Sequence, residues 1–154
     1  MDTLKNLKGV YNFTITGTDG VIRDTFRVEN LVTNAGFAQL ALLAGDASAV
    51  PFTYLALGTS STAPAVTDTA LGAEITTIGL ERVAGTVSRV TTNVTDDTYR
   101  VTTTWTATGS ATVEEVGVFN DATTGTMLSH ALTTSKALSN GETLTGVYTL
   151  AIAV

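Results

Sequence analysis

VYNFTITGTDGVIRDTFRV, residues 10–28, is the stretch that decides the fold class. It contains two β-prone runs, residues 10–16 and 21–28, and Gly17-Thr18-Asp19-Gly20 lies between them. An Asp-Gly pair between two such runs is a strong hairpin signal, because both residues tolerate the positive φ angles that tight turns need. The stretch therefore predicts two antiparallel strands joined by a short turn.

Threonine extends the β prediction to the whole chain. It makes up about a fifth of the 154 residues, and its β-branched side chain suits a pleated, half-buried surface better than a helix. Six further β-prone runs follow the hairpin, at residues 52–57, 83–94, 99–108, 113–119, 126–132 and 143–154. Turn signals such as Asn140-Gly141 separate them. The sequence therefore predicts a mainly β fold, a single-domain β-sandwich or barrel-like structure of about eight strands.

One short helix is expected, at about residues 34–44. Thr33 or Asn34 supplies the N-cap, and Gly45 is expected to end the helix. Four apolar residues at helical spacing predict the stripe that packs on the sheet: Phe37, Leu40, Ala41 and Ala44. A single helical turn is also expected at residues 68–74, capped by Thr67 or Asp68.

Period-2 patterns predict which residues face the core. Val101, Thr103, Trp105 and Ala107 share one face of their strand, so Trp105 is expected to be buried. In the last strand the same spacing joins five apolar residues: Leu144, Tyr148, Leu150, Ile152 and Val154.

The N-terminal segment, residues 1–8, shows no clear period, and residues 9–154 are expected to form one β domain. The segment carries two apolar side chains, Leu4 and Leu7, next to two positive charges, Lys5 and Lys8. Two alternatives stay open: an arm that reaches a neighbouring subunit, or a frayed terminus.

Composition argues against several classes of partner. The net charge is −6 and the basic residues are scattered, so no nucleic acid is expected as a partner. The absence of cysteine excludes disulfides and thiolate metal sites. The N-terminus lacks the apolar run of a secretory signal, and the longest apolar helical stretch, Ala35–Ala44, is about half a membrane span. We therefore expect no membrane partner and synthesis in a cytosol.

No catalytic, cofactor-binding or metal site is indicated. The sole histidine, His130, has no acidic neighbour in sequence, and we expect it at the surface or an interface rather than as a general base. Residues 57–61 superficially suggest a phosphate loop but lack its Gly-Lys-Ser/Thr ending. Asp96, Asp97 and Asp121 lie in predicted turns and could bind calcium, although solvated turn carboxylates are the better interpretation.

Glu114 and Glu115 are consecutive, so in a strand their side chains point to opposite faces. They cannot form a carboxylate pair, and one of them should face inward or lie at an interface. An arginine is its expected partner, because guanidinium pairs bidentately with carboxylate: Arg82, Arg89 or Arg100.

Four segments resemble small structural proteins of tailed-bacteriophage virions. They are NLVTNAGFAQLALLAGD (30–46), FTYLALGTSSTAPAVTDTALGAEI (52–75), TVEEVGVFND (112–121) and GTMLSHALTTSKALSNGETLTGVYTLAI (125–152). Similar strings, in this order, look like those of capsid decoration (cement) proteins and of tail-fiber or baseplate components. The resemblance implies a virion protein without enzymatic activity or cofactor that binds its own copies and other virion proteins.

Within that resemblance the first hypothesis is a capsid decoration protein that stabilises the assembled shell, because a small chain without a coiled-coil or collagen-like shaft suits a cap. It would form a homotrimer and contact the major capsid protein. The alternative is a tail-associated protein at a fiber base or baseplate. A host-surface carbohydrate-binding module is the second alternative.

Overall fold

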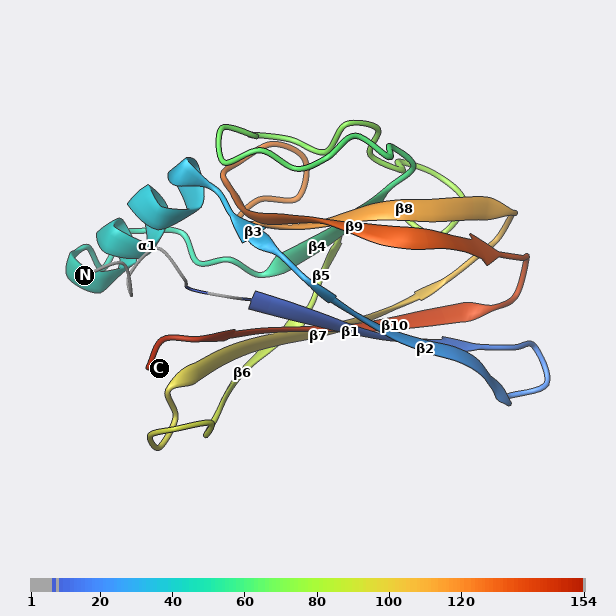
Figure 1. The fold of residues 1–154 in the computed structure, drawn as a ribbon, viewed down its shortest axis with the longest axis horizontal. Helices are drawn as coiled ribbons and strands as arrows, with labels where there is room; N and C mark the ends of the chain where they lie inside the picture. Colours follow the sequence, from blue (N-terminus) through green and yellow to red (C-terminus); the bar gives the residue numbers. More distant parts are fainter. Residues whose placement is uncertain (1–6, 8, 154) are drawn as a thin grey trace.

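The protein is a β-sandwich in which two five-stranded antiparallel sheets face each other (Figure 1). The computed structural model describes residue 7 and residues 9–153. The first sheet has the order β2 (Ile22–Glu29), β1 (Gly9–Thr16), β10 (Thr143–Ala151), β7 (Thr98–Thr106), β6 (Thr86–Val90). The second has the order β3 (Leu31–Val32), β9 (Met127–Leu138), β8 (Ala111–Phe119), β4 (Tyr54–Gly58), β5 (Val83–Ala84). These sheets confirm the predicted mainly β fold, with a sandwich rather than a barrel.

The first hairpin forms as predicted. β1 and β2 pair antiparallel, and Gly20 in the turn between them has a φ of 79°. β1 continues the sheet on its other side, where it pairs with β10. The pairing of β1 with β10 therefore brings the first and last strands of the domain together.

Ten strands form in the described residues, rather than about eight, because a short strand, β3, follows β2 and because residues 83–94 divide into two strands. Residues 83–94 do not form one strand: β5 belongs to the second sheet and β6 to the first. Gly85 is the crossing point, and a Cβ there would lie 2.5 Å from Val101 Cγ2 and 2.8 Å from the Thr102 carbonyl oxygen. On the opposite side, the short strand β3 carries the chain from β2 into the second sheet.

The core lies between the sheets and contains the residues that the period-2 patterns predicted. Trp105 is 3% exposed and donates its indole N–H to the Glu81 carbonyl oxygen. The alternating residues of β7 and β10 are buried with it. Ile152 is the exception: it follows the end of β10 and is 56% exposed. Val154 lies outside the described residues.

The helix α1 spans Asn34–Gly45 and lies at one end of the sandwich (Figure 1). Thr33 is its N-cap, and its hydroxyl accepts a hydrogen bond from Gly36 N at 2.9 Å. Gly45 is the last helical residue rather than a stop beyond the helix, and Asp46 is the C-cap. None of the helical structure in the described part of the chain is long and apolar enough to span a membrane.

The buried stripe of α1 differs from the prediction. Ala41 and Ala44 are exposed, whereas Phe37, Leu40 and Leu43 are half-buried and pack on the core. Gly36 is the fully buried position, because a Cβ there would lie 2.5 Å from the Leu128 carbonyl oxygen. The helix thus approaches the backbone of β9 through a glycine, which an apolar-periodicity rule does not detect.

Candidate functional site

The β4–β5 loop, residues 59–82, covers the outer face of the second sheet (Figure 1). The predicted helical turn at residues 68–74 is absent from it. Instead, the loop returns along the edge of β4, where Thr59 N bonds the Ala73 carbonyl and Ile75 N bonds the Leu57 carbonyl. Backbone hydrogen bonds to β4 therefore replace those that a helix would have made.

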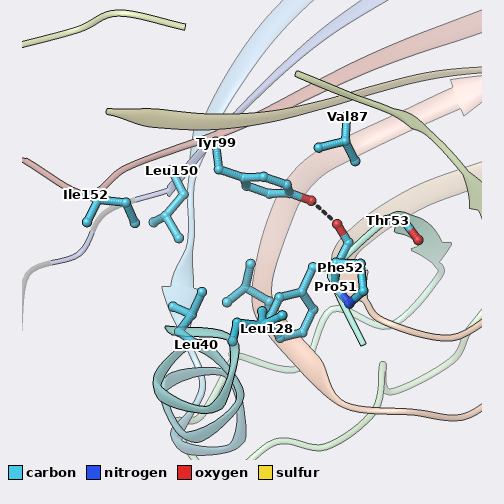
Figure 2. Close-up of a pocket in the computed structure, with 10 residues that line it drawn as sticks. Leu40, Pro51, Phe52, Thr53, Val87, Tyr99, Leu128, Leu150 and Ile152 are labelled. Atoms are coloured by element: carbon cyan, nitrogen blue, oxygen red, sulfur yellow. Dashed lines mark hydrogen bonds between the residues drawn. The ribbon is translucent and has the colours of Figure 1, made fainter. Parts of the chain in front are cut away.

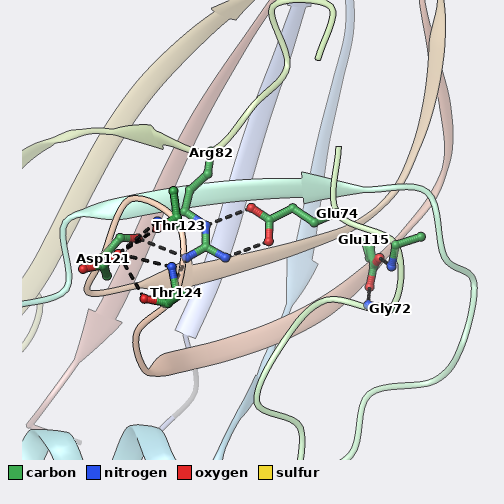
Figure 3. Close-up of polar contacts among 8 residues, drawn as sticks. Gly72, Glu74, Arg82, Glu115, Asp121, Thr123 and Thr124 are labelled. Carbon is green, nitrogen blue, oxygen red and sulfur yellow. Dashed lines mark hydrogen bonds and ion pairs between the residues drawn. The ribbon is translucent and has the colours of Figure 1, made fainter. Parts of the chain in front are cut away.

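Glu115 of β8 is fully buried and holds this loop on the sheet. Its carboxylate accepts hydrogen bonds from three backbone N–H groups of the loop, at 2.7 Å from Ala73, 3.0 Å from Gly72 and 3.3 Å from Ser60 (Figure 3). A buried carboxylate is tolerated only when such donors replace water. Glu115 is thus the buried member of the predicted pair, although it lies beneath the loop on the outer face of the sheet and not in the core between the sheets.

His130 of β9 is the next member of the buried network. Its Nε2 lies 2.8 Å from Glu115 Oε2, and its Nδ1 lies 2.8 Å from Asp68 Oδ2. An ionised carboxylate only accepts hydrogen bonds, so both contacts are satisfied when each ring nitrogen carries a proton. The Asp68 carboxylate also accepts from Ala65 N, and this bond, followed by the His130 contact, lowers the pKa of Asp68.

Two predictions are wrong here. His130 is 4% exposed within a single chain, not at the surface, because the β4–β5 loop folds over it. The partner of Glu115 is this histidine rather than an arginine: Arg82 pairs with Glu74, and Arg100 bonds Ser88. Sequence separation hid the network, since Asp68 and His130 are 62 positions apart.

Arg82 fastens the end of the loop. Its guanidinium forms a bidentate pair with Glu74, at 2.7 and 2.8 Å, and donates to the carbonyl oxygens of Asp121 and Thr124 (Figure 3). It also lies 3.6 Å from the centroid of the Phe119 ring, at cation–π distance. The loop is therefore tied to the β8–β9 turn as well as to the sheet.

Two of the three predicted turn carboxylates, those of Asp97 and Asp121, accept hydrogen bonds within their own turns. Asp121 accepts from Thr123 N and Thr124 N, which lowers its pKa. Asp97 accepts from three backbone N–H groups, and these bonds, led by that of Val94, lower its pKa to about 2. No cluster of three or more potential metal ligands occurs among the residues that the structure describes.

An apolar pocket of about 280 Å³ lies between α1 and the end of the sandwich (Figure 2). Among the lining residues only Tyr99 carries a phenol, and its hydroxyl donates a hydrogen bond to the Phe52 carbonyl oxygen. The other lining residues are almost all aliphatic or aromatic: Leu40, Leu43, Pro51, Phe52, Thr53, Val87, Leu128, Leu150 and Ile152. The pocket can accept an apolar side chain but offers little to a polar ligand. No sequence signal indicated it, because its residues come from six separate segments.

The candidate arm residues are described only in part. Leu7 is half-buried and packs against the core of its own chain. Leu4, Lys5 and Lys8 lie outside the described residues.

A family model described as "Podophage GP4 fiber I protein gp80" matches residues 31–153. The match covers α1, the β4–β5 loop and every strand from β3 to β10. Searches of curated proteins and of solved structures returned no match.

Proposed function

This chain belongs to the podophage GP4 fiber I protein gp80 family, and we propose that it is a tail-associated structural subunit of a phage fiber. The observation that carries the proposal is the family match, which spans residues 31–153. The four segments that resemble virion proteins lie within this range, apart from residue 30. The chain is thus a phage virion structural protein, and the open question is its place in the particle.

The family description favours the tail-associated alternative over the capsid decoration function expected first. It names a fiber and not a shell component, and capsid decoration remains unconfirmed. The carbohydrate-binding alternative gains no support from the aromatic side chains. All ten aromatic side chains lie in the described part of the chain, and each is buried or half-buried, so they form no open platform for stacking.

The buried polar network supports a structural role for the β4–β5 loop. Glu115, His130 and Arg82 hold a 24-residue loop (59–82) in one conformation on the outer face of the second sheet. A preorganised loop loses little conformational entropy when it contacts another subunit. We propose that this loop face contacts other virion proteins and that the subunit assembles as a homotrimer.

Electron microscopy of intact particles with a labelled antibody tests the location. Label on the tail or its fibers is expected, and particles that lack the protein serve as the control. A regular signal over the outer shell would overturn the tail assignment and restore capsid decoration.

Native mass spectrometry of the purified protein tests the oligomeric state. A homotrimer of the 15.9 kDa chain has three times that mass, about 48 kDa. A monomer at micromolar concentration would contradict the trimer without affecting the location, so the two parts of the proposal fail separately.

A further inference from the structure

We propose that the apolar pocket beside α1 is the docking site for the N-terminal segment of the same chain, with Leu4 as the inserted side chain. The ten residues that line this pocket come from α1, from residues 51–53 and from the strands β6, β7, β9 and β10 with the residues that follow β10. The N-terminal segment is residues 1–8, of which the structure describes Leu7 alone. The docking occurs within one subunit and does not depend on where that subunit lies in the virion.

The chemistry of the pocket selects an apolar occupant. Its volume of about 280 Å³ exceeds the roughly 150 Å³ of an apolar cavity that binds benzene, so an aliphatic side chain fits. The Tyr99 hydroxyl is already bonded to Phe52 and offers no free donor. A charged or strongly polar ligand would lose its hydration there without replacement.

The rim of the pocket is also apolar and exposed. Val87 and Ile152 line the pocket and are 45% and 56% exposed, and Leu42 and Val50 adjoin lining residues in sequence. Of the eight exposed large hydrophobic residues in the described part of the chain, two thus line the pocket and two more flank its lining residues in sequence. Such a concentration of apolar surface marks a contact site rather than a random distribution.

The course of β1 brings the N-terminal segment to this pocket. Gly9 pairs with Leu150, and Leu150 lines the pocket. Along β1 and β10 the paired residue numbers sum to 159, and the pairing ends at Gly9 and Leu150, two positions before Ile152, another lining residue. Five extended residues span up to about 17 Å, enough for Leu4 to reach any part of the pocket from Gly9.

The residues of the segment fit a single insertion. Leu4 is flanked by Thr3 and Lys5, so one apolar side chain stands between two polar ones. Leu7 packs half-buried against the core of its own chain, which directs the segment toward its own subunit. Leu4 from a neighbouring copy, as in the intersubunit arm, is the competing occupant.

Disulfide trapping tests the docking cleanly, because the chain has no cysteine. In the test variant, Leu4→Cys is combined with Val87→Cys at the pocket. In the control variant, Leu4→Cys is combined with Val21→Cys; Val21 is 62% exposed and lies next to the β1–β2 turn at the far end of the sandwich (Figure 1). Mild oxidation of the first pair is expected to yield a disulfide within the monomer, seen on a non-reducing gel and mapped by proteolysis. The second pair is expected to remain reduced.

Two results would overturn the proposal. Disulfide-linked dimers in the Val87 pair would assign the pocket to the segment of a second copy. Equal oxidation of both pairs, or none in either, would show that Leu4 does not dock there.

Dye binding gives a second readout. With the segment expelled by Leu4→Asp, the fluorescence of 1-anilinonaphthalene-8-sulfonate is expected to rise severalfold, because the pocket becomes accessible. Lys5→Ala is the matched control and should leave the signal at the level of the unsubstituted protein. Unchanged dye fluorescence in Leu4→Asp, with far-UV circular dichroism unaltered, would contradict the docking.

Discussion

Replacing Glu115 by alanine is expected to lower the free energy of unfolding by about 3–5 kcal/mol, the usual cost of removing one partner from a buried charged pair. The carboxylate is 0% exposed and accepts hydrogen bonds from three backbone N–H groups and from His130. Alanine leaves all four donors without their acceptor, and His130 keeps only Asp68.

The magnitude follows from these contacts. A hydrogen bond to a charged group contributes about 1.5–3 kcal/mol, so four of them would set an upper limit near 6–12 kcal/mol. The loop can lift and expose its N–H groups to water, which offsets part of that loss. About 3–5 kcal/mol is therefore the expected range, and Glu115→Gln, which keeps an accepting oxygen but loses the charge, should cost less.

Glu114 offers a matched control. It is the same residue type in the same strand, but it is half-buried and its carboxylate accepts a hydrogen bond from the Ser135 hydroxyl. Glu114→Ala is expected to cost no more than about 1 kcal/mol. The difference between the two alanine variants isolates the buried network from any effect on strand propensity.

Urea denaturation measures the loss. With a slope of about 2 kcal/mol per molar urea, the midpoint should fall by roughly 1.5–2.5 M in Glu115→Ala. Native-state hydrogen exchange of Glu115→Gln should show faster exchange at Gly72 and Ala73 than in the unsubstituted protein. Equal midpoints for Glu114→Ala and Glu115→Ala, or unchanged exchange at these two amides, would refute the role assigned to the network.

Four further predictions concern the core, the helix, one turn and metal dependence. Trp105→Ala should cost about 3–5 kcal/mol in urea melts, and a loss below about 1 kcal/mol would contradict its burial. Gly36→Ala should destabilise the protein by about 1–3 kcal/mol because the new Cβ would lie 2.5 Å from the Leu128 backbone. Gly45→Ala is the control and should not destabilise it, because no atom lies within 4 Å of the Cβ position there. Equal effects of the two substitutions would refute the close approach of α1 to β9. The pKa of Asp97 is lowered from 3.8 to about 2, so this carboxylate stabilises the fold above pH 3.8 and its contribution is lost as the pH falls through about 2. The melting temperature should therefore fall less over that pH range in Asp97→Asn than in the unsubstituted protein. Parallel curves for the two proteins would contradict the stabilising role of Asp97. EDTA should leave the melting temperature unchanged, and a drop of several degrees would reveal a metal requirement.

The polar network shows why the site was only partly predictable. Strand alternation indicated that Glu114 and Glu115 have different environments, and the structure buries Glu115, although beneath the loop and not in the core. Alternation could not identify the partner, since His130 is 15 positions from Glu115 and Asp68 is 62 positions from His130. Pairing at those separations depends on strand register and on the course of the loop, and neither is encoded in a local pattern.

The sequence by itself determined the local elements of this protein. Asp19-Gly20 between two β-prone runs specified the first hairpin, Thr33 specified the start of α1, and alternation in β7 placed Trp105 in the core. These features follow from backbone sterics and side-chain periodicity within a few residues. Local chemistry is sufficient for them.

Only the tertiary structure decided how these elements combine. It divided residues 83–94 between two sheets at Gly85, where the Val101 side chain and the Thr102 carbonyl leave no room for a Cβ. It laid the β4–β5 loop over His130, and it assembled an apolar pocket from six separate segments. Each of these results depends on which surfaces meet when the two sheets pack, because burial and charge pairing are properties of the folded whole and not of any one stretch of chain.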